Sequence, residues 1–442
     1  MRQVVSCLLL AATLHTVVAA SEDTADLEAL VSGNSVTPAL SGLQLSLLRN
    51  GEAAQGYAFG FAQLGTQGKE PLRRDHKERV ASVSKLVVAI GVMQLVDGGK
   101  LDLDTDVSEY LDWQLRNPAF PDAAITARQL LSHTSSVRDG SAYFIAAGTG
   151  SLRDFFTPGS PYWQNGEHFA QARSEAPGDY FYYANLNFGI LGTLIELLSG
   201  ERFDQYMANH VLGPMGLSAR FDPCEIPASQ RAAAFRKGNE PGSWSPDSDW
   251  LAQVDGAEPQ CFYGMRSTEF ANGFLATYQL GSNATLYSPQ GGLRASADDL
   301  IVILRMLAAK GELEGVRVLS TASVEAMLTP DWTLNAAGSN GLSAGEAQPG
   351  GPTDGLMTSY GLSVHRIDMR AWGFHEGPAL LVGHLGEAYG VLSHALIDPK
   401  TGNGIATIIT GTAADPANSA PGSSPLYRVE EEVLRWWLQQ KP

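Results

Sequence analysis

The sequence predicts an α+β fold in which strands from both ends of the chain form one antiparallel sheet, flanked by helices, with a mostly helical subdomain. Three patterns support this prediction. Strand-like segments begin near residue 42, helical or irregular segments dominate from 101 to 290, and apolar runs separated by turn residues return after 358. Strands at both ends with helices between them favour one composite domain.

The bulk composition is that of a globular, acidic protein. The chain has 442 residues, of which 44% are hydrophobic, so a substantial core can form. It carries 47 acidic and 30 basic residues, for a formal net charge of −17. Such a charge is repelled by phosphate backbones and anionic membranes, so no nucleic-acid partner is expected.

The first twenty residues, "MRQVVSCLLLAATLHTVVAA", have the features of a secretory signal. Arg2 precedes an apolar stretch, and the small residues Ala19 and Ala20 precede an acidic segment. We expect a signal peptide at 1–20, cleavage after Ala20 and an exported protein, periplasmic or secreted. No later segment has the ~18 apolar residues that a membrane-spanning helix needs, so no stable span is expected after cleavage.

The cysteines agree with export. Cys7 lies in the signal segment, which leaves Cys224 and Cys261 as a pair that can form a disulfide in an oxidising compartment. Sequence separation alone does not prove that they meet. The cysteines and the nine histidines show no tight ligand spacing of the kind zinc prefers, so we expect no metal and no other cofactor.

Residues 21–442 are expected to form a single domain. Its sheet part covers about 40–100 and 290–442, and its helical part about 101–290. "LQLSLLRNGEAAQGYAFGFAQ" predicts two strands joined by a turn at Asn50-Gly51.

Three helices follow from local patterns. "SVSKLVVAIGVMQLVD" predicts a helix from 82 to about 97, ended by Gly98-Gly99. "NLNFGILGTLIELLS", residues 185–199, repeats large apolar residues at helical spacing, and "PLYRVEEEVLRWWLQQ" predicts a final helix. The Pro- and Gly-rich segments 222–290 and 335–355 are interpreted as excursions that shape a cleft.

Ser82 and Lys85 suggest nucleophilic catalysis. Their i, i+3 spacing places both side chains on one face of the first helix. The helix N-terminus favours a developing oxyanion near Ser82. A lysine among valines and isoleucines is costly unless it has a function, and a partly desolvated lysine can accept the serine proton near neutral pH.

Two further motifs make the pattern specific. "YYANLNFGILG" places Tyr183 and Asn185 where a loop enters the second helix, and "VGHLGEAYG" places His384 and Gly386 at the end of a predicted strand. Ser-x-x-Lys, Tyr-x-Asn and His-x-Gly in this order resemble the serine β-lactamase and penicillin-binding protein superfamily, nearest to class C β-lactamases, D-Ala-D-Ala peptidases and related esterases. The resemblance covers roughly residues 40–440 and implies a β-lactamase-like fold.

The resemblance also implies a role for each matched residue. Ser82 becomes acylated, while Lys85 and Tyr183 share the acid and base work, Tyr183 with a pKa lowered by the lysine. Asn185 holds Lys85 and the substrate amide or ester. The backbone N–H groups of Ser82 and Glu387 form the oxyanion hole. The expected partner is a small-molecule or peptide substrate.

Two positions depart from the family pattern. His384 stands where many relatives have lysine, and a neutral imidazole binds a substrate carboxylate less strongly than an ammonium does. Glu387 follows the His-x-Gly386 motif where relatives often have a small residue, and its carboxylate would repel anionic substrates. Both departures favour peptides, amides or esters over penicillins.

Several alternatives stand beside this hypothesis. Within the family, the protein could be a carboxylesterase, or a non-catalytic penicillin-binding-like sensor module. "GLSAG" around Ser343 matches the nucleophile elbow of α/β-hydrolases, but a Gly-rich loop surrounds it where that elbow needs a strand and a helix. His133 in "LLSHTSS" is interpreted as a structural polar contact, and Trp244, Trp250 and Phe262 as either cleft lining or packing.

Overall fold

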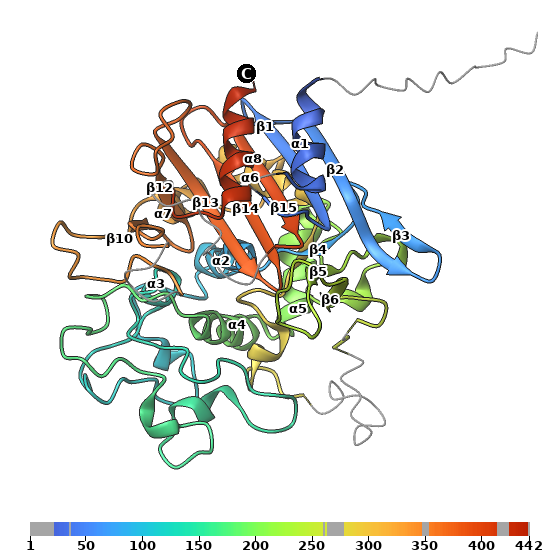
Figure 1. Cartoon of the computed structure of the whole chain (residues 1–442). Helices are drawn as coiled ribbons and strands as arrows, with labels where there is room; N and C mark the ends of the chain where they lie inside the picture. Colours follow the sequence, from blue (N-terminus) through green and yellow to red (C-terminus); the bar gives the residue numbers. More distant parts are fainter. Residues whose placement is uncertain are drawn as a thin grey trace, which may run out of the picture.

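The computed structural model describes residues 22–34, 37–259, 261–262, 278–346, 353–412 and 424–440. The expected signal peptide, 1–20, lies outside the described residues. The described chain forms a large antiparallel sheet with helices on both faces, and a second region of helices and loops beside it (Figure 1). The predicted α+β architecture is therefore confirmed.

Nine strands form the main sheet in the order β10-β11-β12-β13-β14-β15-β1-β2-β3, so the first strands of the chain lie beside the last. The strands of this sheet are β1 (Gly42–Arg49), β2 (Glu52–Gly65), β3 (Gly68–Pro71), β10 (Trp332–Thr333), β11 (Ser359–Tyr360), β12 (His365–Asp368), β13 (Leu380–Ala388), β14 (Val391–Ile397) and β15 (Gly404–Thr410). Short two-stranded pairs are made by β4 (Glu78–Arg79) with β7 (Arg294–Ala295), β5 (Ala234–Lys237) with β6 (Trp250–Val254), and β8 (Glu312–Leu313) with β9 (Val316–Arg317).

The two ends of the chain meet at one strand pair. β1 and β15 pair antiparallel from Gly42 opposite Thr410 to Leu48 opposite Gly404. The predicted hairpin is confirmed: β1 and β2 are joined at Asn50-Gly51, where φ is 50° and 80°. Positive φ at both turn residues is what a two-residue hairpin needs, and Asn-Gly adopts it at low cost.

The helices lie on both faces of the sheet and in the helical region. They are α1 (Glu22–Ser32), α2 (Val83–Asp97), α3 (Ala127–Leu131), α4 (Leu186–Ser199), α5 (Phe203–Tyr206), α6 (Ala297–Ala308), α7 (Thr321–Leu328) and α8 (Arg428–Gln439). A π-helical turn, Met207–Leu212, follows α5. No helix in the described part of the chain combines the length and apolar character needed to cross a bilayer.

The predicted helices at 82–97, at 185–199 and at the C-terminus are all confirmed. α1 was not predicted, because its short acidic sequence has weak periodicity. Its Leu27 and Leu30 are buried in a cluster that includes Leu434 and Trp437 of α8, on one face of the sheet. Burial against α8, rather than intrinsic propensity, accounts for this helix.

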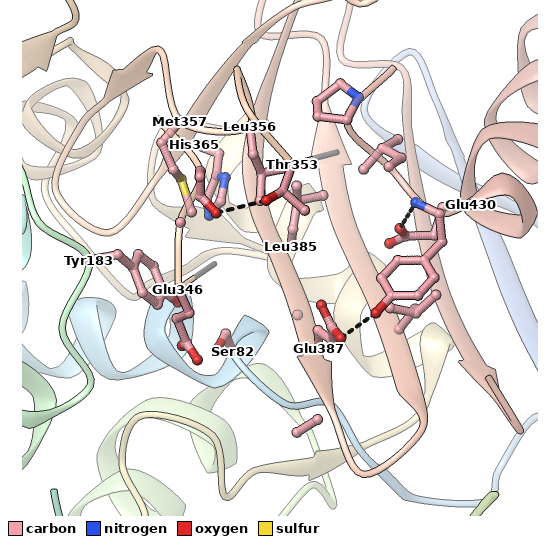
Figure 2. A pocket seen from close by; sticks show the side chains of 18 of the residues that line it. Ser82, Tyr183, Glu346, Thr353, Leu356, Met357, His365, Leu385, Glu387 and Glu430 are labelled. Carbon is pink, nitrogen blue, oxygen red and sulfur yellow. Dashed lines mark hydrogen bonds between the residues drawn. The ribbon is translucent and has the colours of Figure 1, made fainter. Parts of the chain in front are cut away.

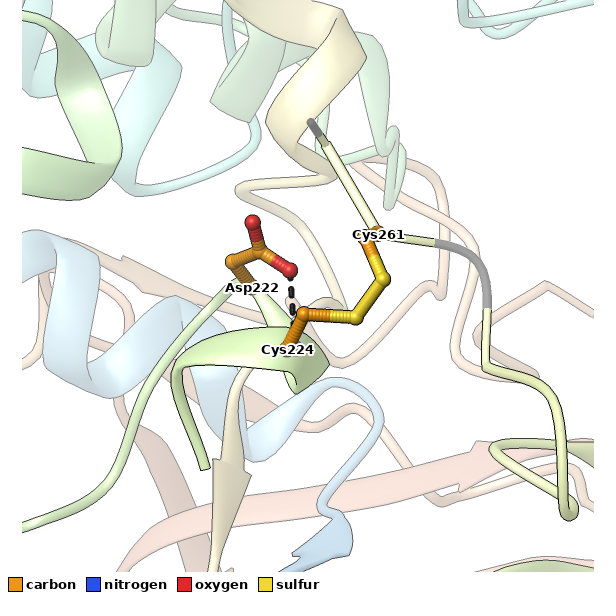
Figure 3. Close-up of side chains that lie close together, drawn as sticks. All are labelled: Asp222, Cys224 and Cys261. Carbon is orange, nitrogen blue, oxygen red and sulfur yellow. Dashed lines mark hydrogen bonds between the residues drawn. A yellow bond between two sulfur atoms is a disulfide. The ribbon is translucent and has the colours of Figure 1, made fainter. Parts of the chain in front are cut away.

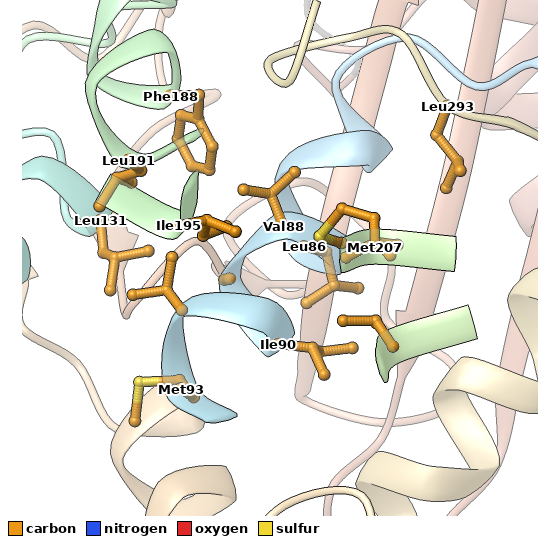
Figure 4. Packing of buried hydrophobic residues seen from close by; sticks show 14 of the residues in the cluster. Leu86, Val88, Ile90, Met93, Leu131, Phe188, Leu191, Ile195, Met207 and Leu293 are labelled. Atoms are coloured by element: carbon orange, nitrogen blue, oxygen red, sulfur yellow. The ribbon is translucent and has the colours of Figure 1, made fainter. Parts of the chain in front are cut away.

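α2 is the central helix of the molecule, and it is apolar on every side. Figure 4 shows Leu86, Val88 and Ile90 of α2 facing side chains of α4 and the following turn, such as Phe188 and Met207. A helix buried all round is fixed in position by its neighbours, so the residue at its N-terminus is held as well. Gly98 closes the helix, with its N–H bonded to the Gln94 carbonyl at 2.9 Å.

A disulfide joins Cys224 and Cys261, with Cα atoms 5.3 Å apart (Figure 3). Asp222 lies beside it, and its carboxylate accepts the backbone N–H of Cys224 at 2.9 Å and that of Phe262 at 3.3 Å. Both sulfur atoms are bonded to each other, so this cluster offers no thiolate to a metal ion.

Candidate active site

Ser82 is held at the N-terminus of α2 by a strained backbone. Ala81, just before it, has φ 44°, in the left-handed region that costs a non-glycine residue roughly 1–3 kcal/mol. Ser84 Oγ donates to the Ala81 carbonyl at 2.7 Å, and Ser393 Oγ of β14 donates to the Val80 carbonyl at 2.7 Å. These bonds tie the start of α2 to the sheet and fix the position of Ser82.

Lys85 lies one helical turn after Ser82 and is fully buried. Its Nζ atom donates to Ser82 Oγ at 2.9 Å and to Asn185 Oδ1 at 2.8 Å. A third bond, of 2.9 Å, goes to the Gln290 carbonyl. Burial lowers the pKa of Lys85 to about 8, although the Glu346 carboxylate acts in the opposite direction. A lysine with this pKa can lose a proton near neutral pH and then act as a base.

Tyr183 contacts both of these side chains. Lys85 Nζ lies 4.8 Å from the centre of the Tyr183 ring, and Tyr183 lines the same cavity as Ser82. Burial, aided by Tyr360, raises the pKa of Tyr183 well above its usual range. The expected lowering of this pKa by the lysine is therefore wrong for the resting site, because desolvation of the phenolate dominates.

His133 supports the Tyr183 ring. The two rings stack with their centres 4.3 Å apart, and His133 Nδ1 accepts the backbone N–H of Ala184 at 3.1 Å. Burial, together with the charge of Lys85, lowers the pKa of His133 well below its usual range, so the ring is neutral. This arrangement agrees with the structural role expected for His133.

Asn185 links Lys85 to two carboxylates that the sequence analysis did not identify. Its Nδ2 atom donates to Asp139 Oδ2 and to Glu346 Oε1, both at 3.0 Å. Asp139 also accepts the backbone N–H of Leu186, at the start of α4, at 2.8 Å. Burial raises the pKa of Asp139 to about 6. Asn185 thus positions Lys85 through its Oδ1 atom, while its Nδ2 group already donates to the two carboxylates.

His384 lies close to Tyr183, with the ring centres 6.4 Å apart, but it is buried behind the wall of the cleft and does not face it. Its side chain is fully buried and is not among the residues that line the cavities at Ser82. Its Nδ1 atom bonds to the Leu385 carbonyl at 2.5 Å, and its Nε2 atom to the Tyr360 hydroxyl at 2.9 Å. Burial lowers the pKa of His384 well below its usual range. The neutral ring thus packs inside the protein. Because side chains alternate along β13, His384 points to the face opposite to that of Leu385 and Glu387.

Gly386 and Glu387 do lie at the site. A Cβ atom on Gly386 would come within 2.9 Å of the Ser82 backbone nitrogen, so only glycine lets β13 approach the start of α2 this closely. Glu387 Oε1 accepts a hydrogen bond from the Tyr427 hydroxyl at 2.5 Å, and burial raises the Glu387 pKa to about 7. The carboxyl group therefore faces the site as expected.

Ser82 lines two adjoining cavities, of about 360 Å³ and about 560 Å³. Both are also lined by Glu346, Glu387, Ala388 and Tyr389. In the smaller cavity, Figure 2 shows Ser82 between Glu346 on one side and Glu387 on the other. The site is thus an open cleft with two carboxyl groups beside the serine hydroxyl.

The two excursions predicted from composition contribute to these walls. Met357 and Glu346, in or next to the segment 335–355, line the smaller cavity, and Phe262 lines the larger one. Trp250 instead packs against Phe61, and Trp244 lines neither cavity.

Ser343 is not part of the site. It lies in a turn, lines neither cavity, and accepts the backbone N–H of Gly355 through its Oγ atom at 3.2 Å. Among the described residues around Ser343, neither the strand before the serine nor the helix after it that a nucleophile elbow requires is present.

The fold therefore brings together four residues that the sequence motifs predicted: Ser82, Lys85, Tyr183 and Asn185. The residues missed by sequence reasoning come from loops or strand ends without periodicity: Asp139, Glu346, Tyr360 and His365. Only a charged or aromatic residue type marked them, and that signal is shared with many surface positions.

Comparisons with known proteins identify a matching family model and several similar sequences. A family model described as Beta-lactamase matches residues 27–422. The protein Rv1367c of Mycobacterium tuberculosis is 27% identical over 271 residues, 59% of this chain and 60% of that protein. Esterase EstB of Burkholderia gladioli is 31% identical over 192 residues, 40% of this chain and 46% of the esterase. The chain thus spans at most about 60% of the length of these two curated relatives.

Solved structures show the same fold. The D-amino acid amidase from Ochrobactrum anthropi SV3, in complex with L-phenylalanine amide, is similar with a TM-score of 0.63. The match covers 94% of this chain and 96% of the amidase, at 18% sequence identity. At this identity the similarity concerns the fold, and it confirms the fold expected from the motifs.

Proposed function

Because the chain belongs to the β-lactamase family, we propose that it is an exported serine hydrolase that cleaves amides or esters through an acyl-enzyme on Ser82. One observation carries this proposal. The Lys85 amine lies 2.9 Å from the Ser82 hydroxyl in a buried site that lowers the pKa of the lysine to about 8. A nucleophile and its base within hydrogen-bond reach, with the base held by Asn185, are what acyl transfer needs.

The proposed proton path uses two groups. Neutral Lys85 takes the proton of Ser82 as its oxygen attacks the carbonyl carbon. Tyr183, a neutral phenol, gives its proton to the leaving nitrogen or oxygen and is reprotonated by Lys85. Water then attacks the acyl group along the reverse path, and Ser82 regains its proton. The backbone N–H groups of Ser82 and Glu387 bind the oxyanion.

The charge of the smaller cavity favours neutral or cationic substrates. Glu346 and Glu387 flank Ser82, and Glu430 also lines the smaller cavity, against one guanidinium there, that of Arg236. A substrate carboxylate would be repelled by the ionised groups among these, to which Glu387, with a pKa of about 7, contributes only in part at neutral pH, so amides and esters fit better than penicillins. The named activities of two similar proteins, an esterase and a D-amino acid amidase, support the same reaction class.

Export is the second part of this proposal. The apolar segment 1–20 with its small residues before the acidic stretch supports it, as does the pairing of Cys224 with Cys261. Fractionation of the native host should recover the chain outside the cytoplasm, beginning near Ser21. Recovery of the full-length chain in the cytoplasm would contradict export.

The reaction is tested with a fluorescent fluorophosphonate. Wild type and Ser343→Ala should label, and Ser82→Ala should not; labelling of Ser82→Ala equal to wild type would overturn the assignment. A panel of nitrocefin, a D-Ala-D-Ala peptide, p-nitrophenyl butyrate and a D-amino acid amide then separates lactamase, peptidase, esterase and amidase. Labelling without turnover on any of them would favour the non-catalytic sensor.

A further inference from the structure

His365 is a buried polar side chain in the wall of the cleft, and neither of its ring nitrogens has a partner in the described part of the chain. It begins β12, is 2% exposed and lines the 360 Å³ cavity that also contains Ser82. Neither Nδ1 nor Nε2 has a hydrogen-bond partner among the described residues. Figure 2 shows the His365 ring beside Met357, on the same side of the cavity as Tyr183.

The nearest polar rings do not satisfy His365. The Tyr360 hydroxyl bonds to His384 Nε2 at 2.9 Å, and His384 Nδ1 bonds to the Leu385 carbonyl. The ring of His365 lies 4.5 Å from that of His384 and 5.1 Å from that of Tyr360, in ring-to-ring contacts. His384 and Tyr360 thus satisfy each other, and His365 is left with its full hydrogen-bonding capacity.

His365 is uncharged at neutral pH. Burial, together with the charge of Lys85, lowers the pKa of His365 to about 3. A neutral imidazole has one N–H donor and one acceptor nitrogen. Leaving such a buried donor unpaired is unfavourable, so a ligand group that accepts this bond gains binding free energy.

The surroundings indicate which kind of group fits. Met357 and Leu385 line the same cavity, so the chain that reaches His365 has apolar contacts. Both ring nitrogens of His365 are closed to solvent, and Met357, which is unbranched and flexible, can move to open a path to the imidazole. Glu346, and Glu387 to the extent that it is ionised, disfavour an anion in this cavity. An uncharged oxygen on an otherwise apolar chain matches all of these features.

We propose that His365 determines specificity by donating a hydrogen bond to an uncharged oxygen, a carbonyl or an ether, on the part of the substrate that fills this cavity. The inference rests on the proposed hydrolase function and adds to it a feature of the substrate. Specificity of this kind is strong because a substrate without the oxygen leaves the buried N–H unpaired.

The test compares matched ester pairs. Methoxyalkanoyl p-nitrophenyl esters are paired with alkanoyl esters of equal length, and methoxyalkyl acetates with alkyl acetates, so that either side of the ester can reach the cavity. For each pair, the measured quantity is the ratio of kcat/KM for the ether-containing ester to kcat/KM for the alkyl ester. In at least one series, this ratio should be roughly 5- to 10-fold higher in wild type than in His365→Leu. His365→Asn, which keeps an N–H donor, should retain part of the preference, and the exposed His375→Leu all of it.

Two results would overturn the inference. One is an unchanged ether-to-alkyl ratio for every pair in His365→Leu, while Ser82→Ala abolishes turnover; the hydrolase assignment then survives without the specificity role. The other does not depend on turnover. An unpaired imidazole predicts that His365→Leu unfolds at the same or higher denaturant concentration than wild type. A clear loss of stability in His365→Leu that His365→Asn, which keeps an N–H donor, does not share would show that a ring nitrogen has a partner inside the protein.

Discussion

Lys85 Nζ lies 2.9 Å from Ser82 Oγ: Ser82 is the N-cap residue of α2, and Lys85 lies in the buried first turn of this helix. The i, i+3 spacing places the two side chains together, and the packing of α2 against the sheet and α4 removes water from around the amine. Burial is thus the physical cause of both the rigid geometry and the lowered pKa.

Replacing Lys85 with arginine should nearly abolish turnover. Arginine keeps the positive charge but cannot act as a base, since its pKa stays above 12. We expect kcat to fall by roughly 10²–10⁴-fold. Steady-state assays on the best ester substrate measure this, with the exposed Lys310→Arg as the matched control. Activity of Lys85→Arg within a few-fold of wild type would rule out the lysine as base.

The pH profile should report the titration of Lys85. The reactive form is the neutral amine, and the pKa is about 8, so kcat/KM should rise with pH and reach half its plateau near pH 8. The Glu346 carboxylate raises this pKa. In Glu346→Gln the midpoint should therefore move to lower pH, whereas the exposed Glu376→Gln should leave it in place. A shift to higher pH in Glu346→Gln would contradict this coupling.

Glu78 should make stability fall with rising pH. Its carboxyl group is fully buried without a hydrogen-bond partner among the described residues, and burial raises its pKa from 4.5 to about 8. Between these values the folded state holds a proton that the unfolded state has lost. The free energy of unfolding should therefore drop by about 1.4 kcal/mol per pH unit from this group alone.

Glu78→Gln should remove that contribution. Urea unfolding from pH 5 to 8 should show a flatter pH dependence than wild type and a more stable protein at pH 8. The exposed Glu70→Gln provides the control and should follow the wild-type curve. Parallel curves for wild type and Glu78→Gln would show that Glu78 is not protonated in the folded protein.

The Cys224–Cys261 disulfide should contribute measurably to stability. It closes a loop with a sequence separation of 37, for which chain entropy gives roughly 3–4 kcal/mol. The free energy of unfolding of the double variant Cys224→Ala, Cys261→Ala should be lower by that amount, so its urea midpoint should fall. Reduced wild type should have the same urea midpoint as the double variant. Oxidised wild type and the double variant unfolding together would contradict the prediction.

Local sequence signals predicted much of the fold and the central part of the site. The Asn50-Gly51 turn, the period of α4 and the spacing of Ser82 and Lys85 are each set by neighbours in the sequence. Strand patterns at both ends were enough to predict a shared sheet. Strands need neighbouring strands to pair with, and the middle of the chain showed few strand patterns.

The remaining features depend on contacts between distant segments. Glu346 comes from a Gly-rich loop that composition marks only as irregular, yet it reaches Asn185. His384 is buried because Tyr360, from a two-residue strand, covers it. The pKa of Tyr183 depends on how completely the phenol is desolvated, and no sequence motif encodes that. Burial and tertiary partners therefore set the chemistry at these positions.

The central claim is that the Ser82 hydroxyl becomes acylated during turnover. Mass spectrometry of enzyme quenched in acid while it hydrolyses a slow ester measures this directly. The claim predicts a mass gain equal to the acyl group, mapped to the peptide that contains Ser82 and absent from Ser82→Ala. An acyl group on another residue, or turnover by Ser82→Ala at the wild-type rate, would contradict it.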